Sequence, residues 1–415
     1  MYERVLLWAT PVFLLLIALE CAVAAIRRRS PYRVGDALAS ISLGALSTYL
    51  GVYTRLFSFG IYVALYEVVR FATFDDASAW VWVAALLAYD FLYYWNHRLG
   101  HEINVLWAAH VVHHQSEEFN LSTALRQSSS GFLLSWIFYA PMALAGFPPR
   151  LFLFISLIDL LYQFWIHTEQ IGSLGVLDRI LATPSNHRVH HGVNDQYVDR
   201  NYGGILILWD RLFGTFQPEL ASVPVVYGSR DALRSWNPLW ANLHTYAAML
   251  RDAVAARLWA DKLRVFLAHP GWRPADVAAR APKAPFSLAR YAKYAPSLPR
   301  PLALYCIVQG LLVLGLGAYY LAVSPGWAPP AAVGGLAVLV ASQWVLGGLS
   351  EARRGFAWLE ALRVLLLASL ALAPPSPLAA STVPMLLLPA TLALAAALVA
   401  WLWAATRSLR PAAAS

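Results

Sequence analysis

Apolar runs long enough to cross a lipid bilayer recur along this 415-residue chain and constrain its fold more than any other feature. The first covers about residues 5–25 and is followed by three arginines, Arg27, Arg28 and Arg29. It is expected to stay as an uncleaved anchor, with a cleaved signal peptide as the alternative. Because the hydrophobic residues make up 59% and the charged residues 13%, we predict an all-α integral membrane protein, a multi-span helical bundle.

The other apolar runs are spaced along the whole chain. Residues 36–70 are too long for one straight span, so the number of crossings there stays open. Pro148 and Pro149 are expected to turn a helical hairpin. The remaining spans are predicted at residues 78–95, 132–146, 151–166, 302–323, 331–348, 356–373 and 383–404.

Four domains are predicted from this pattern. Residues 1–75 form anchor helices, and residues 76–220 form a catalytic domain. Residues 221–300 form a basic cytoplasmic segment, and residues 301–415 form a four-helix membrane region. The net charge of +8 is concentrated at residues 251–300, which hold ten Lys or Arg against three Asp. A loop beside anionic lipid explains this better than a nucleic-acid groove, so no nucleic-acid partner is expected.

Eight of the eleven histidines fall in two short windows. They are His97, His101, His110, His113 and His114, followed by His187, His190 and His191. Their spacings, H-x3-H and H-x2-H-H, bring imidazoles to one helix face, because side chains three and four apart are neighbours. A lone histidine would be an ordinary buried or interfacial imidazole, but three such groups together predict a metal centre.

Three further histidines are weighed separately. His167 ends an apolar run on one helical stripe with Asp159 and Gln163, so it is either a ninth ligand or a structural residue. His244 and His269 have no partner at ligand spacing. Both are expected to be ordinary loop residues.

The ligand type and number favour two redox-active metal ions. Imidazole suits Fe, Zn, Cu and Ni, but this set exceeds the roughly four ligands of tetrahedral zinc. Cys21 and Cys306 lie in apolar runs, so no thiolate site is expected. The zinc-protease motif H-E-x-x-H is absent, since His101 and Glu102 are followed by Ile-Asn-Val. A redox dimetal site is therefore favoured over a metallohydrolase.

The positive-inside rule orients this centre. It places the arginines after the first span in the cytoplasm and Asp75 with Asp76 on the opposite side. Both histidine windows then face the cytoplasm. The Ala-rich, Arg-over-Lys composition favours a multi-pass protein of a bacterial inner membrane, with the endoplasmic reticulum as its location in a eukaryote.

Carboxylates near the histidines are candidates for orienting the ligands. Asp90 lies in a predicted span, where a charge is costly, on the helical stripe of His97 and His101. It is expected to accept a ligand N–H, with a helix-to-helix hydrogen bond as the alternative. Glu102 is a ligand, a support for a ligand or a solvated charge, and the supporting role is ranked first.

A polar stretch before the hairpin supplies candidate cofactor contacts. They are Asn120, Arg126 and Gln127. Such side chains could meet a lipid headgroup or a cofactor. The alternative is that they cap a helix in solvent.

These residues resemble the three histidine boxes of the fatty acid hydroxylase/sterol desaturase superfamily. The segments that begin at His97, Trp165 and His190 look closest to the alkylglycerol monooxygenase branch, and the resemblance covers roughly residues 79–217. It implies a non-haem centre of two Fe per chain that uses O2 and two electrons to insert one oxygen atom into a lipid C–H bond. In that branch, hydroxylation beside an ether oxygen gives a hemiacetal that collapses to a fatty aldehyde, with tetrahydrobiopterin as reductant.

Other functions stay open at this point. A sterol or fatty-acyl hydroxylase or desaturase would use the same di-iron centre, with a cytochrome or ferredoxin as redox donor. A metal transporter would also use intramembrane Asp and His, but it should place ionisable groups along several spans. The four C-terminal spans are almost free of such groups.

Overall fold

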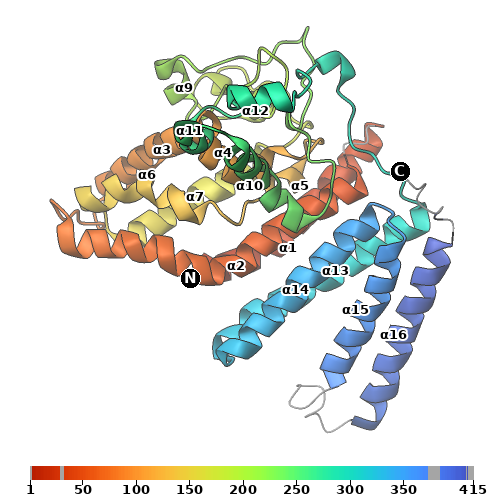
Figure 1. Ribbon diagram of the computed structural model, residues 1–415. Helices are drawn as coiled ribbons and strands as arrows, with labels where there is room; N and C mark the ends of the chain where they lie inside the picture. Colours follow the sequence, from red (N-terminus) through yellow and green to blue (C-terminus); the bar gives the residue numbers. More distant parts are fainter. Residues whose placement is uncertain (1, 29–31, 373–383, 408, 410–415) are drawn as a thin grey trace. The chain divides into compact units, whose positions relative to one another are not determined.

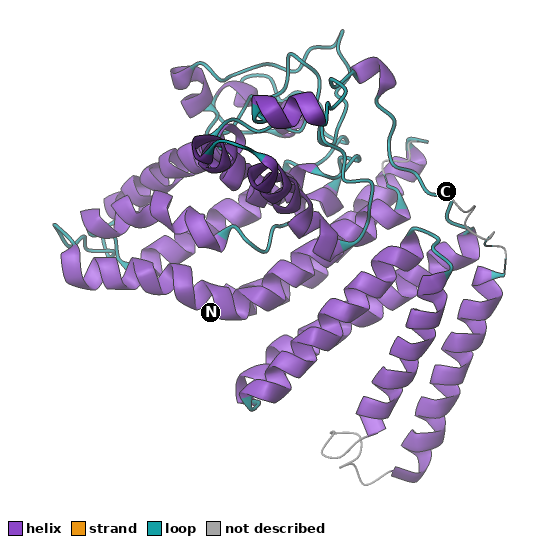
Figure 2. Ribbon diagram, in the orientation of Figure 1, coloured by secondary structure: helices purple, strands orange, loops and turns teal. Residues whose placement is uncertain are grey.

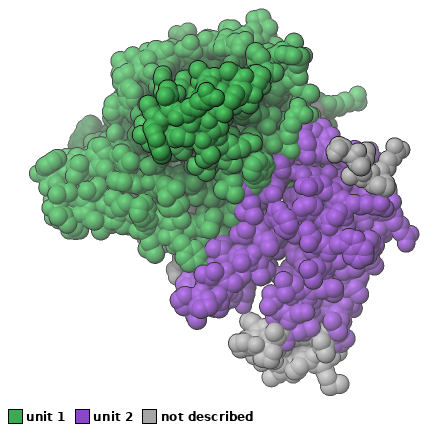
Figure 3. Space-filling view, viewed as in Figure 1, with its two compact units in different colours: residues 1–234, 240–293 green, residues 235–239, 294–415 purple. Residues whose placement is uncertain are grey.

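The computed structural model describes residues 2–28, 32–372, 384–407 and 409, and its elements are helices (Figures 1 and 2). In these residues the only strand-like pairings are two isolated bridges, Leu181–Leu206 and Gly192–Tyr227. The all-α prediction is therefore confirmed. The chain divides into two compact units, residues 1–234 with 240–293, and residues 235–239 with 294–415 (Figure 3).

The first unit holds the long helices of the N-terminal half and a set of shorter helices. Figure 1 shows the short helices α9, α11 and α12 together on one side of α3, α6 and α7. The helices are α1 (Tyr2–Ile26), α2 (Val34–Val69), α3 (Ala79–Glu102), α4 (Asn104–His114), α5 (Leu121–Ala124), α6 (Phe132–Ala145), α7 (Pro149–Trp165), η1 (Leu177–Arg179), α8 (Pro184–His190), α9 (Leu208–Phe213), α10 (Pro238–Ala255), α11 (Trp259–Leu267), α12 (Ala275–Arg280) and η2 (Leu288–Arg290).

Aromatic packing joins the long helices of this unit. Tyr62 of α2 stacks on Phe152 of α7 at a ring separation of 4.3 Å, and Tyr89 of α3 stacks on Tyr139 of α6 at 4.8 Å. Such pairs add about 0.5–1.5 kcal/mol each to the burial of their apolar surface. This core supports the end of α3, which carries His97 and His101.

The turn predicted at Pro148 and Pro149 is confirmed, but α6 and α7 pack mainly on α2 and α3 and little on each other. The C-cap of α6 is Gly146 at φ 104°, a left-handed conformation that favours glycine. A side chain is also excluded there, because a Cβ atom would lie 2.0 Å from the carbonyl oxygen of Ala72. Pro149 then begins α7 as its first residue, where its missing N–H costs nothing.

The second unit contains four helices, each of which packs on the next, and α16 returns to α13. They are α13 (Arg300–Val323), α14 (Pro329–Ser350), α15 (Gly355–Leu372) and α16 (Pro384–Thr406), with η3 (Ser324–Gly326) after α13. The loop predicted between the last two spans lies largely outside the described residues.

Six helical segments among the described residues are long and apolar enough to cross a membrane. They lie in α1, α2 and the four helices of the second unit. The region left open at residues 36–70 is one continuous helix, α2, whose segment Val34–Thr54 belongs to this set while Leu56–Val69 is shorter. The predicted spans at 78–95, 132–146 and 151–166 are helical but fall outside the set. Helices α6 and α7 are too short for it, and the polar residues of α3 lower its mean hydropathy.

Candidate metal centre

Four separate segments bring nine histidines together. The last two turns of α3 carry two of them, α4 carries three, and one follows α7. The last three belong to α8 and its C-cap residue. Helix α8 begins at Pro184, whose fixed φ suits a first helical position, and is only 7 residues long. Because His187, His190 and His191 are three or four residues apart or adjacent, all three imidazoles of this segment reach the centre.

The nine imidazoles form two groups. Within each group the ligand atoms all lie within 4.8 Å of one another. One group is His97, His101, His110, His114 and His190, and the other is His113, His167, His187 and His191. His110 and His113 are half-buried, and the other seven are buried. The structure thus places His167 in the second group, and the two groups together contain all eight histidines of the two windows.

The distances between ring nitrogens match those of a shared metal ion. His110 Nε2 lies 3.0 Å from the Nε2 atoms of both His97 and His114. His187 Nε2 lies 2.9 Å from His167 Nε2 and 3.2 Å from His191 Nε2. Two nitrogens bound at about 2.1 Å and at right angles to one metal would be about 3.0 Å apart.

Backbone carbonyls decide which nitrogen of each ring is free. His113 Nδ1 donates to the Arg126 carbonyl at 3.0 Å, and His167 Nδ1 donates to the Gln163 carbonyl at 2.7 Å. A neutral imidazole has one N–H, so both Nε2 atoms present lone pairs, and these face each other at 3.1 Å. A cation between them would convert this repulsion into attraction. The Nε2 atom of His101 is likewise buried without a hydrogen-bond partner.

The same arrangement of carbonyl and ring recurs in the first group. His97 Nδ1 donates to the Tyr202 carbonyl at 2.8 Å, and His190 Nδ1 donates to the Arg200 carbonyl at 3.0 Å. Such contacts fix the tautomer and the direction of a metal-binding ring. The donor set and its orientation therefore fit two metal ions.

Burial keeps the imidazoles neutral. It holds the pKa values of His114, His187 and His190 well below the usual 6.5, and the charges of neighbouring imidazoles lower them further. Burial likewise lowers the pKa of His113 to about 4. Because only the neutral ring can bind a metal, the centre is ready for ligation at neutral pH.

Asp199 is a residue that the sequence interpretation missed. Its Oδ1 atom lies 3.3 Å from His101 Nδ1, and its Oδ2 atom lies 3.5 Å from His269 Nε2. Burial alone would raise the pKa of Asp199, but the hydrogen bond and charge of His101 lower it below the usual value. His269 lies in a loop outside both histidine groups, as expected, and contacts this carboxylate, whereas His244, also expected in a loop, lies in α10.

Asp90 and Glu102 have other partners than those expected. Asp90 accepts hydrogen bonds from the backbone N–H groups of Ile205 and Leu206, at 2.7 and 3.1 Å, and from Trp209 Nε1 at 2.9 Å. Its described bonds therefore tie α3 to α9 and to the loop before it and do not reach an imidazole, so they fit the helix-to-helix alternative. Glu102 accepts from Arg98 Nε at 2.8 Å in a half-exposed pair one turn away. Helical periodicity put Asp90 on the histidine stripe, and Glu102 was chosen because it adjoins His101, but neither pattern could foresee these nearer donors.

Asp210, also missed from the sequence, supports His97 indirectly. Its carboxylate accepts the N–H groups of Tyr202 and Gly203, each at 2.7 Å, and the Thr215 hydroxyl at 2.6 Å. These bonds fix the backbone whose Tyr202 carbonyl orients His97. Nothing in the sequence pattern singled out Asp210, because a single acidic residue in a short helix resembles an ordinary surface charge.

The candidate cofactor contacts are engaged inside the protein. Asn120 caps α5 through Ser122, and Gln127 Nε2 donates to the Ala124 carbonyl at 3.2 Å. Arg126 is 1% exposed and donates to the Val112 carbonyl at 2.7 Å. The alternative that these residues cap a helix therefore describes Asn120, except that the cap is buried. Arg126 instead stabilises the segment of α4 that carries His113.

Comparison with known proteins agrees with the geometry. The model of the fatty acid hydroxylase family matches residues 82–215. The chain is 41% identical to alkylglycerol monooxygenase of Homo sapiens over 308 residues, which are 74% of this chain and 68% of that protein. It is 36% identical to the enzyme of the same name from Xenopus tropicalis over 359 residues, 86% and 80% of the two chains.

More distant relatives are also hydroxylases. Ornithine lipid hydroxylase OlsE of Rhizobium tropici is 32% identical over 142 residues, 32% of this chain and 41% of that protein. No solved structure matches the chain. The family match covers both histidine windows and His167. This chain therefore belongs to the alkylglycerol monooxygenase family of fatty acid hydroxylase-type proteins, and it is an oxygen-dependent oxidoreductase of lipids.

Proposed function

We propose that this chain binds two iron ions, one in each histidine group, and hydroxylates the carbon beside the ether oxygen of an alkylglycerol. The hemiacetal so formed would collapse to a fatty aldehyde and a glycerol product. The observation that carries the proposal is the pairing of lone-pair-bearing Nε2 atoms, such as those of His113 and His167 at 3.1 Å. The support for the substrate is the identity to proteins named alkylglycerol monooxygenase.

The chemistry that iron supplies when bound is the reduction of O2, with one oxygen atom inserted into a C–H bond and the other released as water. Two electrons and two protons balance this reaction, and a reduced pterin such as tetrahydrobiopterin is the proposed donor. The chain itself keeps the imidazoles neutral by burial and turns their Nε2 atoms inward through carbonyls. Asp199 orients His101 in the same way.

The proposed orientation places the histidine centre on the cytoplasmic side of the membrane. The support is the excess of Lys and Arg at residues 251–293 in the unit that carries the centre. A soluble electron donor would reach the centre from that side. Labelling of a cysteine introduced at Ser222, with an impermeant reagent added to intact cells, tests this topology, and labelling from outside contradicts it.

Metal analysis tests the centre. Elemental analysis and Mössbauer spectroscopy of the purified full chain should find about two Fe per chain with a coupled spectrum. Stoichiometric zinc without iron would refute the proposal. His113→Ala and His190→Ala each remove one ligand from a different group, so each should lower the metal content and abolish turnover. His244→Ala, outside both groups, should do neither.

Product analysis tests the substrate. Purified protein with an alkylglycerol, O2 and reduced pterin should release fatty aldehyde. A second candidate is hydroxylation of another membrane lipid without ether cleavage, favoured by the similarity to ornithine lipid hydroxylase. That candidate gains support if a hydroxylated lipid accumulates and no aldehyde forms, with the metal content unchanged.

A further inference from the structure

Two neighbouring segments of the first unit expose apolar side chains. One surrounds η1 and the other is α9. Ile207 N–H donates to the Ile180 carbonyl at 3.0 Å, and Arg211 Nε donates to the Arg179 carbonyl at 2.9 Å, so the segments lie side by side. Their exposed apolar residues, here named the apolar collar, are Val176, Leu177, Ile180, Leu208, Leu212 and Phe213. Val176 and Leu212 each expose 69% of their surface.

The apolar collar continues an exposed stripe on α3. Trp80, Val83 and Leu87 are exposed at helical spacing along that stripe. The next position, Phe91, has its ring 6.3 Å from the ring of Phe213 in the collar. Phe213 also meets Trp95 at 5.1 Å, and tryptophan is typical of the level where acyl chains meet headgroups. The collar thus lies where the apolar surface of α3 ends.

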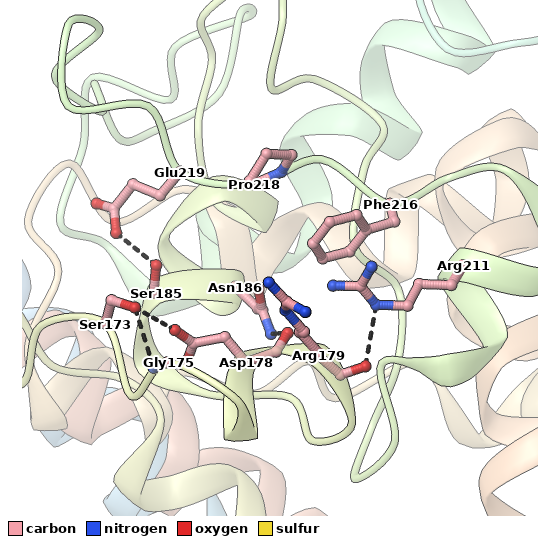
Figure 4. Close-up of a pocket in the computed structure, with 10 residues that line it drawn as sticks. All are labelled: Ser173, Gly175, Asp178, Arg179, Ser185, Asn186, Arg211, Phe216, Pro218 and Glu219. Carbon is pink, nitrogen blue, oxygen red and sulfur yellow. Dashed lines mark hydrogen bonds between the residues drawn. The ribbon is translucent and has the colours of Figure 1, made fainter.

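A polar cavity of about 310 Å³ adjoins the collar. Its lining includes Arg179 and Arg211 from the collar segments, and Figure 4 shows both guanidinium groups pointing into it. The guanidinium of Arg211 stacks on Phe216, with its central carbon 3.8 Å from the ring centre. Among the described residues, neither arginine forms an ion pair with a carboxylate.

The carboxylates of this cavity already have partners. Asp178 accepts the Leu174 N–H at 2.9 Å and the Thr183 hydroxyl at 2.5 Å. Glu219 pairs with Arg188 at 2.7 Å. Two guanidinium groups therefore remain for an anion from outside. Arginine suits phosphate, because its planar fork can donate two parallel hydrogen bonds.

We propose that the apolar collar inserts into the membrane surface and that Arg179 with Arg211 binds the headgroup of an anionic phospholipid, whose phosphate charge is not neutralised by a choline cation as it is in phosphatidylcholine. Apolar side chains would enter the acyl boundary while the arginines stay at headgroup level. The site also adjoins the metal centre through α8, since Asn186 Nδ2 donates to the carbonyls of Asp178 and Leu181, each at 3.0 Å. The proposal does not depend on the identity of the metal or the oxidised lipid.

Lipid retention tests the headgroup site. The full chain is placed in nanodiscs with equal amounts of phosphatidylglycerol and phosphatidylcholine, and the bound lipids are counted by native mass spectrometry. The wild-type chain should retain phosphatidylglycerol preferentially, and Arg179→Gln with Arg211→Gln should lower that preference at least about tenfold. The matched control, Arg257→Gln with Arg290→Gln, removes the same charge from two exposed positions and should keep the preference. An equal loss in both double variants, or none in the first, overturns the site.

Spin labelling tests insertion of the collar without altering the arginines. In a Cys21→Ser background, nitroxides are attached at Leu212→Cys and, as control, at the exposed loop position Ser222→Cys. The label at position 212 should be shielded from an aqueous nickel chelate and accessible to O2, which concentrates in lipid. The label at 222 should be accessible to the chelate. Equal access of the chelate to both positions refutes insertion.

Discussion

At the residue scale, the hydrogen-bond acceptors that orient the imidazoles matter as much as the imidazoles themselves. Carbonyl groups of Gln163, Arg126, Arg200 and Tyr202 each accept an Nδ1–H and leave Nε2 free. His101 differs, because its Nδ1 lies against the carboxylate of Asp199. A charged acceptor makes this ring a stronger electron donor than its neighbours.

Asp199→Asn tests that role. An amide oxygen accepts more weakly than a carboxylate, so the affinity for metal should fall by about tenfold to a hundredfold. Competition with a chelator measures it on the purified protein. Asp195→Asn is the matched control, because Asp195 is an exposed carboxylate paired with Arg230. Equal affinities for the two variants would show that Asp199 has no part in metal binding.

The histidines could be predicted from sequence, and their supports could not. Regular spacing on helices makes His97 with His101 or His187 with His190 visible in the chain. Asp199 comes from a loop at φ 57°, where periodicity carries no information, and its contact with His101 spans 98 residues. Asp90 could be recognised from the sequence, but its partners could not, since they are Trp209 of α9 and N–H groups of a distant loop.

At the scale of elements, Asp90 fastens the loop before α9 to α3. It accepts three hydrogen bonds from that loop and from Trp209, as described above. The same loop presents the Tyr202 carbonyl to His97. The Asp90 carboxylate therefore stabilises the fold and also holds the loop whose Tyr202 carbonyl orients His97.

Asp90→Ala should destabilise the protein even without metal. Loss of three bonds to a carboxylate, offset by relief from burying it, should cost about 2–4 kcal/mol. Thermal unfolding of the metal-free protein in detergent measures this. A residue acting only through an imidazole would leave the metal-free protein unchanged, which is the contrary outcome. Glu102→Gln, in a half-exposed pair, should cost less than about 0.5 kcal/mol.

Helix α15 contains an ion pair that the sequence interpretation overlooked. The four C-terminal helices were described as almost free of ionisable groups, yet Glu360 and Arg363 are both buried. Arg363 Nε donates to Glu360 Oε2 at 2.7 Å, and the Tyr305 hydroxyl of α13 donates to Glu360 Oε1 at 2.9 Å. The spacing of three residues permitted the pair, but its burial depended on how α13 packs against α15.

Arg363→Leu should destabilise the second unit strongly. It leaves the Glu360 carboxylate buried without its cation, at a cost of about 3–5 kcal/mol. The double variant Glu360→Leu with Arg363→Leu should lose less, because no uncompensated charge remains. Thermal unfolding compares the two. If the double variant is as unstable as Arg363→Leu, the pair contributes by more than charge compensation.

At the scale of the whole molecule, all nine clustered histidines belong to the first compact unit. Hydropathy predicted the helices of both units because lipid-facing runs are long and uniform. It could not predict how α3, α4, α7 and α8 converge, since that depends on contacts between distant segments. Because so many imidazoles are buried in one unit, the free energy of unfolding should depend on pH.

Acid should destabilise the metal-free protein before it titrates the carboxylates. In the unfolded chain a histidine takes up a proton near pH 6.5, whereas burial lowers the pKa of His113 in the folded chain to about 4. Between these values the unfolded state binds more protons, so the free energy of unfolding falls as the pH falls. Denaturant unfolding of metal-free protein from pH 7 to 4 should show this decline. His113→Gln should make it shallower, and bound metal should delay it, because metal and protons compete for the same nitrogens. Identical pH dependence in the wild type and His113→Gln would contradict the assignment to this residue.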